Sequence, residues 1–214
     1  MAFVIINPNS TASMTAAMLA AARSAAPGLD FEGWTSRAGP SAIEGEADGI
    51  AARGPLLALV DDAAAAGADG IVIGCFDDTA LAEAAARVSC PVIGLGQAAF
   101  HQCAMRNWRF SIVTTLAVSV PIIDGNVARY GLGGYLGRVR ASDVAVLDLD
   151  RDPDGAVAQI LAEARRALTE DDATAIVLGC AGMVQVTQAL RSALACEIVD
   201  PVESAARALT WLAA

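Results

Sequence analysis

The chain contains two copies of one short phrase, placed about half of its 214 residues apart. Residues 67–75 read GADGIVIGC, and residues 172–180 read DATAIVLGC. Each copy predicts a buried β-strand that ends in a glycine, followed by a cysteine where a helix should start. Ligands of open α/β sheets bind at this end of the strands. Two matching halves that face each other would therefore bring Cys75 and Cys180 to one cleft.

Short β-rich runs alternate with alanine-rich helical runs along the whole chain, which is typical of a parallel α/β sheet. The runs expected to form strands are residues 3–7, 30–35, 70–74, 91–95, 110–114, 137–140, 144–149, 175–179 and 197–200. We expect an α/β fold of two pseudo-symmetric lobes, each a mostly parallel sheet flanked by helices, with the active site in the cleft between them. Residues 1–97 plus 201–214 are expected to form the first lobe, and residues 98–200 the second.

Helix-start signals precede most of the alanine-rich runs. Ser10 or Thr11 is expected to cap a helix over 12–26, and Asp78 precedes a run over 79–88. Pro55 is expected in the first turn of its helix, and Pro201 opens the last one.

The formal net charge of −10 argues against a nucleic-acid partner, which would favour a clustered basic face. No apolar run reaches the roughly 18 residues that a membrane span needs. The chain starts directly with a predicted strand and not with a signal-peptide pattern. We therefore expect a cytoplasmic protein that binds a small-molecule substrate and neither nucleic acid nor membrane, and we expect it to form a homo-oligomer.

A single histidine, His101, limits the chemistry that the chain can build. An HExxH motif or a His-rich metal cluster is excluded, so we expect no metal site. His101 itself lies in a helix-like stretch and is interpreted as an ordinary, partly exposed helix residue.

One segment matches a nucleotide-binding fingerprint. Residues 94–99 read GLGQAA, which fits GxGxxA between a strand and a helix. The acidic residue expected about 20 positions further on is missing, and the segment follows the fourth predicted strand instead of the first. Both departures disfavour dinucleotide binding.

The five cysteines divide into two groups. An odd count without a CxxC pair predicts free thiols in a reducing compartment. A free cysteine usually behaves as a small hydrophobe, which is our interpretation of Cys90, Cys103 and Cys196. Cys75 and Cys180 differ because a following helix N-terminus would lower the thiol pKa toward a reactive thiolate. Two opposed thiols suit proton removal from one face of a carbon and proton return on the other.

Polar residues follow the first strand of each predicted half. Residues 7–11 read NPNST, and Thr114 and Thr115 follow the matching strand of the second half. Helix capping is their ordinary role, and it is compatible with ligand binding at the same mouth. A two-lobed binding protein for a small metabolite, which needs no reactive thiols, stays open as an alternative.

Taken together, these segments resemble the aspartate/glutamate/hydantoin racemase superfamily, most closely its hydantoin and allantoin racemases. The resemblance is carried by residues 6–11, 39–40, 43–45, 74–78, 91–96, 112–115 and 177–183. It implies a cofactor-independent racemase in which Cys75 and Cys180 are the acid/base pair, one as thiolate and the other as thiol. It also implies a pocket lined by Asn9, Ser10, Phe76, Thr114, Thr115, Ala181 and Gly182.

The residues that follow each cysteine bear on the substrate. Phe76, Ala181 and Gly182 suit a neutral ring amide better than a zwitterion, so we expect racemisation of 5-substituted hydantoins. The alternatives are an amino-acid racemase of the aspartate/glutamate type, a maleate-isomerase-like enzyme and an allantoin racemase. The chain departs from hydantoin racemases at residues 78–80, where they commonly show Asp-Pro-Gly, and at Gln97, where they commonly show Glu.

Overall fold

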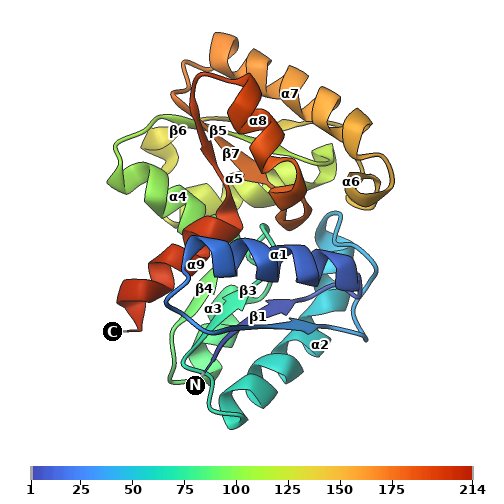
Figure 1. The fold of residues 1–214 in the computed structure, drawn as a ribbon, viewed down its shortest axis with the longest axis vertical. Helices are drawn as coiled ribbons and strands as arrows, with labels where there is room; N and C mark the ends of the chain where they lie inside the picture. Colours follow the sequence, from blue (N-terminus) through green and yellow to red (C-terminus); the bar gives the residue numbers. More distant parts are fainter. Residues whose placement is uncertain (1, 214) are drawn as a thin grey trace.

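The computed structural model describes residues 2–213, whose strands form two separate parallel sheets (Figure 1). The first sheet has the order β2-β1-β3-β4, with β1 at Phe3–Asn7, β2 at Phe31–Thr35, β3 at Gly70–Ile73 and β4 at Val92–Gly94. The second has the order β6-β5-β7-β8, with β5 at Phe110–Thr114, β6 at Leu136–Ala141, β7 at Ala175–Gly179 and β8 at Glu197–Val199. Both sheets follow one topology, which confirms the predicted α/β fold of two equivalent lobes.

The central strands of the two sheets pair in equivalent registers. Ile6 of β1 lies beside Ile73 of β3, and Thr114 of β5 lies beside Gly179 of β7. Every residue of β1, β3, β5 and β7 is buried, as expected for parallel strands with both faces covered. The chain therefore leaves β3 and β7 at corresponding edges, where the two repeated cysteines follow.

Helices cover both faces of each sheet (Figure 1). They are α1 (Ala12–Ala25), α2 (Glu46–Ala65), α3 (Leu81–Arg87), α4 (Leu95–Met105), α5 (Val120–Arg129), α6 (Asp148–Arg151), α7 (Pro153–Glu170), α8 (Thr187–Ala193) and α9 (Pro201–Leu212). Three 3₁₀ turns join them, η1 (Ala117–Ser119), η2 (Gly133–Tyr135) and η3 (Ala181–Gln185). Helix α9 follows the second sheet but packs on α1 and α4 where the lobes meet. The residue boundaries given above for the two lobes stay a prediction.

The lobes share one core. A single buried cluster joins Ile5 and Val72 of the first sheet to Ile112 and Val177 of the second. Phe100 of α4 lies at its centre, with ring centroids 5.8 Å from Phe110 and 5.4 Å from Phe76. Such aromatic pairs each add about 0.5–1.5 kcal/mol beyond their buried area. Phe76, which follows Cys75, thus packs against a ring that contacts the second sheet.

Two predicted elements were wrong. Residues 144–149 form no strand; they run as a loop into α6, because Val144, Val146 and Leu149 each turn inward onto buried clusters. Pro55 lies inside α2 and not in its first turn, since that helix already begins at Glu46.

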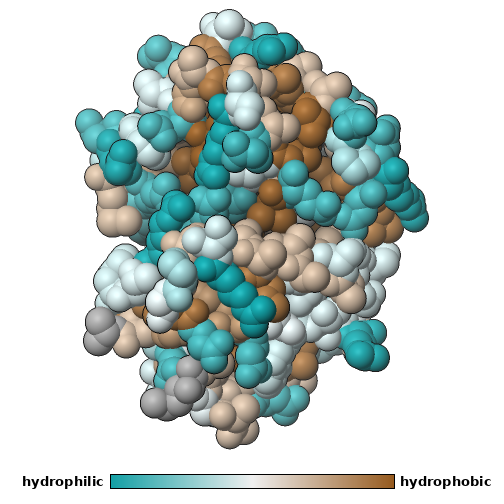
Figure 2. All heavy atoms as spheres, in the orientation of Figure 1, coloured by the Kyte–Doolittle hydropathy of each residue, from teal (hydrophilic) through white to brown (hydrophobic). Residues whose placement is uncertain are grey.

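Figure 2 shows polar and apolar side chains intermixed on one face of the molecule. The outline of the molecule is narrower where the two halves meet. None of the helices that residues 2–213 form has the length and apolar character that a membrane crossing requires.

Candidate active site

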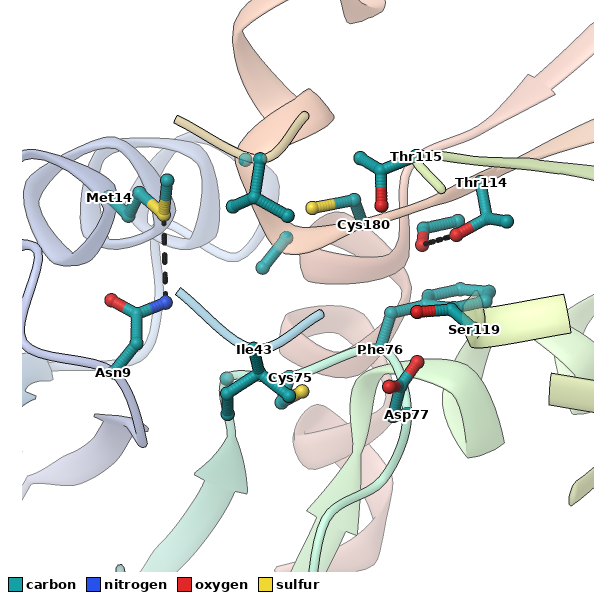
Figure 3. A pocket seen from close by; sticks show the side chains of 15 residues that line it. Asn9, Met14, Ile43, Cys75, Phe76, Asp77, Thr114, Thr115, Ser119 and Cys180 are labelled. Atoms are coloured by element: carbon teal, nitrogen blue, oxygen red, sulfur yellow. Dashed lines mark hydrogen bonds between the residues drawn. The ribbon is translucent and has the colours of Figure 1, made fainter. Parts of the chain in front are cut away.

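Cys75 and Cys180 lie on opposite sides of one small pocket between the lobes (Figure 3). Cys75 follows β3 and Cys180 follows β7, so equivalent strand ends supply the two thiols. The free volume of the pocket is about 30 Å³, and Cys75 is only 8% exposed. The free space between the two thiols is therefore small in this structure.

Most of the residues expected to line the pocket do so. Asn9, Phe76, Thr114, Thr115, Ala181 and Gly182 surround the two cysteines. Ser10 lies outside this lining, where its hydroxyl donates to the Pro40 carbonyl at 3.2 Å.

The pocket also contains side chains that sequence reasoning missed. They are Met14, Ile43, Asp77, Ser119 and Val146. Asp77 and Ile43 lie in segments 74–78 and 43–45, which carry the family resemblance, and that was the available signal. The others come from elements whose position follows only from tertiary packing.

A backbone N–H two residues further along lowers the pKa of each thiol, that of Asp77 for Cys75 and that of Gly182 for Cys180. Cys75 also accepts a hydrogen bond from the Thr79 hydroxyl at 3.4 Å, whereas the Met183 N–H donates to the backbone carbonyl of Cys180 at 3.1 Å. Thr79 stands where hydantoin racemases commonly have proline, so this departure gives Cys75 a hydroxyl partner.

Burial nevertheless keeps both thiols protonated in the unliganded protein. It raises the pKa of Cys75 far above its usual range and the pKa of Cys180 to about 12. The negative charge of Asp77 raises both pKa values further. The expectation of a lowered thiol pKa was therefore wrong for this structure, because desolvation outweighs the hydrogen bonds.

Asp77 provides the one acidic side chain among the lining residues, apart from the thiols. Burial raises the pKa of its carboxyl to about 6, so it is mostly ionised at neutral pH. Its carboxylate accepts no hydrogen bond from the residues that the structure describes, and Figure 3 shows it directed toward the pocket.

Asn9 faces the pocket from the other side, with its amide orientation fixed (Figure 3). Its Oδ1 accepts from Asn7 Nδ2 at 3.0 Å and from the Thr11 N–H at 2.9 Å. Its Nδ2 therefore points inward, where a weak 3.6 Å contact to the Met14 sulfur is its partner. This N–H group is free to donate to a ligand.

The hydroxyl groups near Cys180 differ in whether they are free to bind a ligand. Thr114 Oγ1 donates to the Gly179 carbonyl at 2.8 Å and so holds β5 to β7. Thr115 and Ser119 have no side-chain hydrogen bond within residues 2–213, so both can serve a ligand.

Residues 94–99, which resemble a nucleotide-binding fingerprint, bind the side chain of Asp78. The Asp78 carboxylate accepts from the N–H groups of Gly96 at 3.0 Å and Gln97 at 2.8 Å, and from Tyr130 Oη at 2.8 Å. A side chain at Gly94 would collide with this carboxylate. Asp78 therefore caps α4, and the prediction that it begins α3 was wrong. A phosphate has no room where this anion lies.

His101 is exposed on α4, where Nδ1 lies 2.8 Å from the Gln97 carbonyl, and it does not line the pocket. Across residues 2–213, no group of three or more His, Cys, Asp or Glu side chains is arranged to hold a metal ion.

Comparison with known proteins agrees with this geometry. The model of the Asp/Glu/Hydantoin racemase family matches residues 4–209. A hydantoin racemase of Rhizobium meliloti is 41% identical over 95% of this chain and 85% of its own length. Allantoin racemase from Klebsiella pneumoniae has a TM-score of 0.93 and 36% identity, over 98% of this chain and 86% of its own. Allantoin racemase from Pseudomonas fluorescens has a TM-score of 0.90 and 30% identity, over 98% and 91%. The chain belongs to the Asp/Glu/hydantoin racemase family.

Proposed function

We propose that this protein racemises 5-substituted hydantoins with Cys75 and Cys180 as two opposed acid/base groups. The observation that carries the proposal is the pair of thiols, held at equivalent strand ends on opposite sides of one pocket. One sulfur, as thiolate, removes the C5 proton. The other, as thiol, donates a proton to the opposite face of C5. The carbanion between the two steps is an enolate whose negative charge rests largely on the C4 oxygen.

The raised thiol pKa values fit a weak carbon acid. A thiolate whose conjugate acid has a high pKa is a strong base once it forms, and base strength speeds proton abstraction. Backbone N–H groups near each sulfur lower the thiol pKa, so they stabilise the thiolate when it forms. The low thiolate population at neutral pH is the corresponding disadvantage.

The charges of the pocket favour a neutral ring over an amino acid or a dicarboxylate. No Lys, Arg or His is among the lining residues, while Asp77 contributes a negative charge. A substrate carboxylate would lie near that anion without a cation, which is costly in a buried site. A hydantoin is uncharged at neutral pH and carries ring N–H groups. Allantoin is itself a hydantoin with a ureido group at C5, so the relatives' names lead to the same ring.

Racemisation in deuterated water tests this proposal. Single enantiomers of a 5-alkylhydantoin, allantoin, aspartate and glutamate are incubated with the protein, and optical rotation and deuterium at C5 are followed. We expect rotation to decay with deuterium incorporation for the hydantoin ring compounds only. Turnover of an amino acid, or no exchange with any hydantoin, would refute the proposed substrate class.

A further inference from the structure

Asp77 presents a partly buried carboxylate that has no hydrogen-bond donor within residues 2–213. A donor on a bound ligand would stabilise this carboxylate, because burial already disfavours its charge. Asp77 lines the same pocket as the two thiols, and Figure 3 shows its carboxylate directed into that pocket. The geometry therefore calls for a ligand that brings an N–H or O–H group to this side of the pocket.

Asn9 presents the complementary group. Figure 3 shows Asn9 and Asp77 at opposite sides of the space between Cys75 and Cys180. Asn7 and Thr11 hold the Asn9 amide so that its N–H group, and not its oxygen, faces inward. The pocket thus has an acceptor on one side and a donor on the other, across the line between the sulfurs.

A hydantoin ring matches this polarity around its reacting carbon. C5 is flanked by N1–H on one side and by the C4 carbonyl on the other. We propose, resting on the function proposed above, that Asp77 accepts the N1–H of the ring and Asn9 donates to the C4 oxygen. This arrangement fixes the ring orientation while the two thiols lie above and below C5.

The reverse orientation is disfavoured by charge. It would bring the C4 oxygen, which becomes negative during proton removal, against the Asp77 carboxylate. Two like charges a few ångströms apart in a poorly solvated site repel each other by several kcal/mol. Donors at a developing oxyanion are each worth about 10²–10³-fold in rate, so the Asn9 side of the pocket favours the enolate.

Methylated substrates test the proposal. The value of kcat/KM is measured for a 5-alkylhydantoin and for its 1-methyl and 3-methyl derivatives, with the wild type, Asp77→Ala and Asp77→Asn. Asp62→Asn, on the exposed surface of α2, is the matched charge control. Differences in C5 acidity cancel, because the same substrate pair is compared across enzymes.

In the wild type and in Asp62→Asn, we expect 1-methylation to lower kcat/KM by about 10–100-fold. In Asp77→Ala this penalty should shrink to less than about threefold, since the acceptor is gone and the methyl group has room. Asp77→Asn keeps a neutral acceptor and a similar shape, so its penalty should be intermediate. The effect of 3-methylation should stay the same in all four proteins.

An unchanged 1-methyl penalty in both Asp77 variants, with normal circular dichroism spectra, would overturn the assignment of Asp77. A change confined to the 3-methyl compound would overturn the ring orientation. In both cases the wild type would still racemise the parent hydantoin. Failure of the wild type on the parent compound would instead refute the proposed function and this inference with it.

Discussion

Burial, more than hydrogen bonding, governs the protonation of Cys75 and Cys180. Because the pKa of each thiol is raised, to about 12 for Cys180, the thiolate fraction grows about tenfold per pH unit through the neutral and moderately alkaline range. We therefore expect the alkylation rate by iodoacetamide to rise from pH 7 to pH 10 without a plateau, and kcat/KM for racemisation to rise above pH 7 until the imide N–H of the hydantoin ionises. Peptide mass spectrometry of the alkylated protein measures the first, and polarimetry the second.

The same shifts affect stability. The folded protein keeps thiol protons that the unfolded chain releases above about pH 8.5, so this contribution is present below that pH and lost as pH rises further. Cys90, which is partly exposed and lies outside the pocket, is the internal reference for the alkylation experiment. Alkylation of Cys75 or Cys180 that levels off near pH 7 would contradict the assigned protonation.

At the level of single residues, the sequence predicts the site where both the residue type and its position recur in the two halves of the chain. The matched phrases single out Cys75 and Cys180 from the five cysteines, and the expected pocket residues follow them or the matching strands. Met14 and Val146 reach the pocket from a helix and a loop, so no local pattern predicts them. The thiol pKa values also depend on the depth of burial, which is a property of the assembled lobes.

The segment between β3 and α3 carries backbone strain. Ala80 has a φ of 54°, in the left-handed region that favours glycine. This left-handed conformation is disfavoured by about 1–2 kcal/mol for a residue with a Cβ atom. Ala80→Gly should therefore raise the free energy of unfolding by about 0.5–1 kcal/mol, after the larger entropy of glycine in the unfolded chain is subtracted. Thermal unfolding should show a Tm about 2 °C higher.

Ala85→Gly, on the exposed face of α3, is the matched control. There the helical conformation suits alanine, so the same substitution should destabilise the protein by about 1 kcal/mol. Equal destabilisation by both substitutions would show that Ala80 is not strained.

Helices and strands are predicted correctly where the apolar residues on one or both of their faces follow a regular pattern. The central strands have near-continuous apolar runs, and the eight strands of the structure coincide closely with predicted ones. Residues 144–149 have the same apolar character, but they pack inward from a loop. Asp78 has the expected residue type for a cap, and it caps α4 because the turn after Cys75 folds back over Gly94 and Gly96.

Glu44 forms a hydrogen bond between the lobes, across the pocket. Its Oε1 accepts from the Val146 N–H at 2.7 Å, which joins the loop before α2 to the loop after β6. The neighbouring Ile43 and Val146 side chains line the pocket. A free volume of about 30 Å³ is far below the roughly 300 Å³ of small ligand pockets, so we expect the pocket to widen on substrate entry and this contact to break.

Glu44→Ala should raise the population of the open form. A single hydrogen bond to a partly exposed carboxylate contributes about 1 kcal/mol, which corresponds to about fivefold. We expect about fivefold faster alkylation of Cys75 and faster hydrogen exchange at the Val146 amide. Cys75 is the better reporter, because the charge of Glu44 also raises the pKa of Cys180.

Glu44→Gln separates the contact from the charge, since its amide oxygen still accepts from Val146. It should leave Cys75 alkylation near the wild-type rate. Identical rates in all three proteins would show that this contact does not hold the pocket closed.

The whole-molecule prediction of two equivalent lobes follows from the alternation of elements and the repeat. The shared core does not, because Phe76, Phe100 and Phe110 come from separate elements and meet only on folding. The small free volume of the pocket is likewise a consequence of packing between lobes.

Exchange at C5 by the two single-cysteine variants tests the two-thiol account most directly. Cys75→Ser and Cys180→Ser are incubated separately with each enantiomer of a 5-alkylhydantoin in deuterated water, with Cys103→Ser as the buried control. We predict that both site variants lose racemisation by about 10³-fold or more, the scale of a lost acid/base group. Residual deuterium exchange should favour one enantiomer in Cys75→Ser and the opposite one in Cys180→Ser. Racemisation at the wild-type rate by either variant would contradict the account.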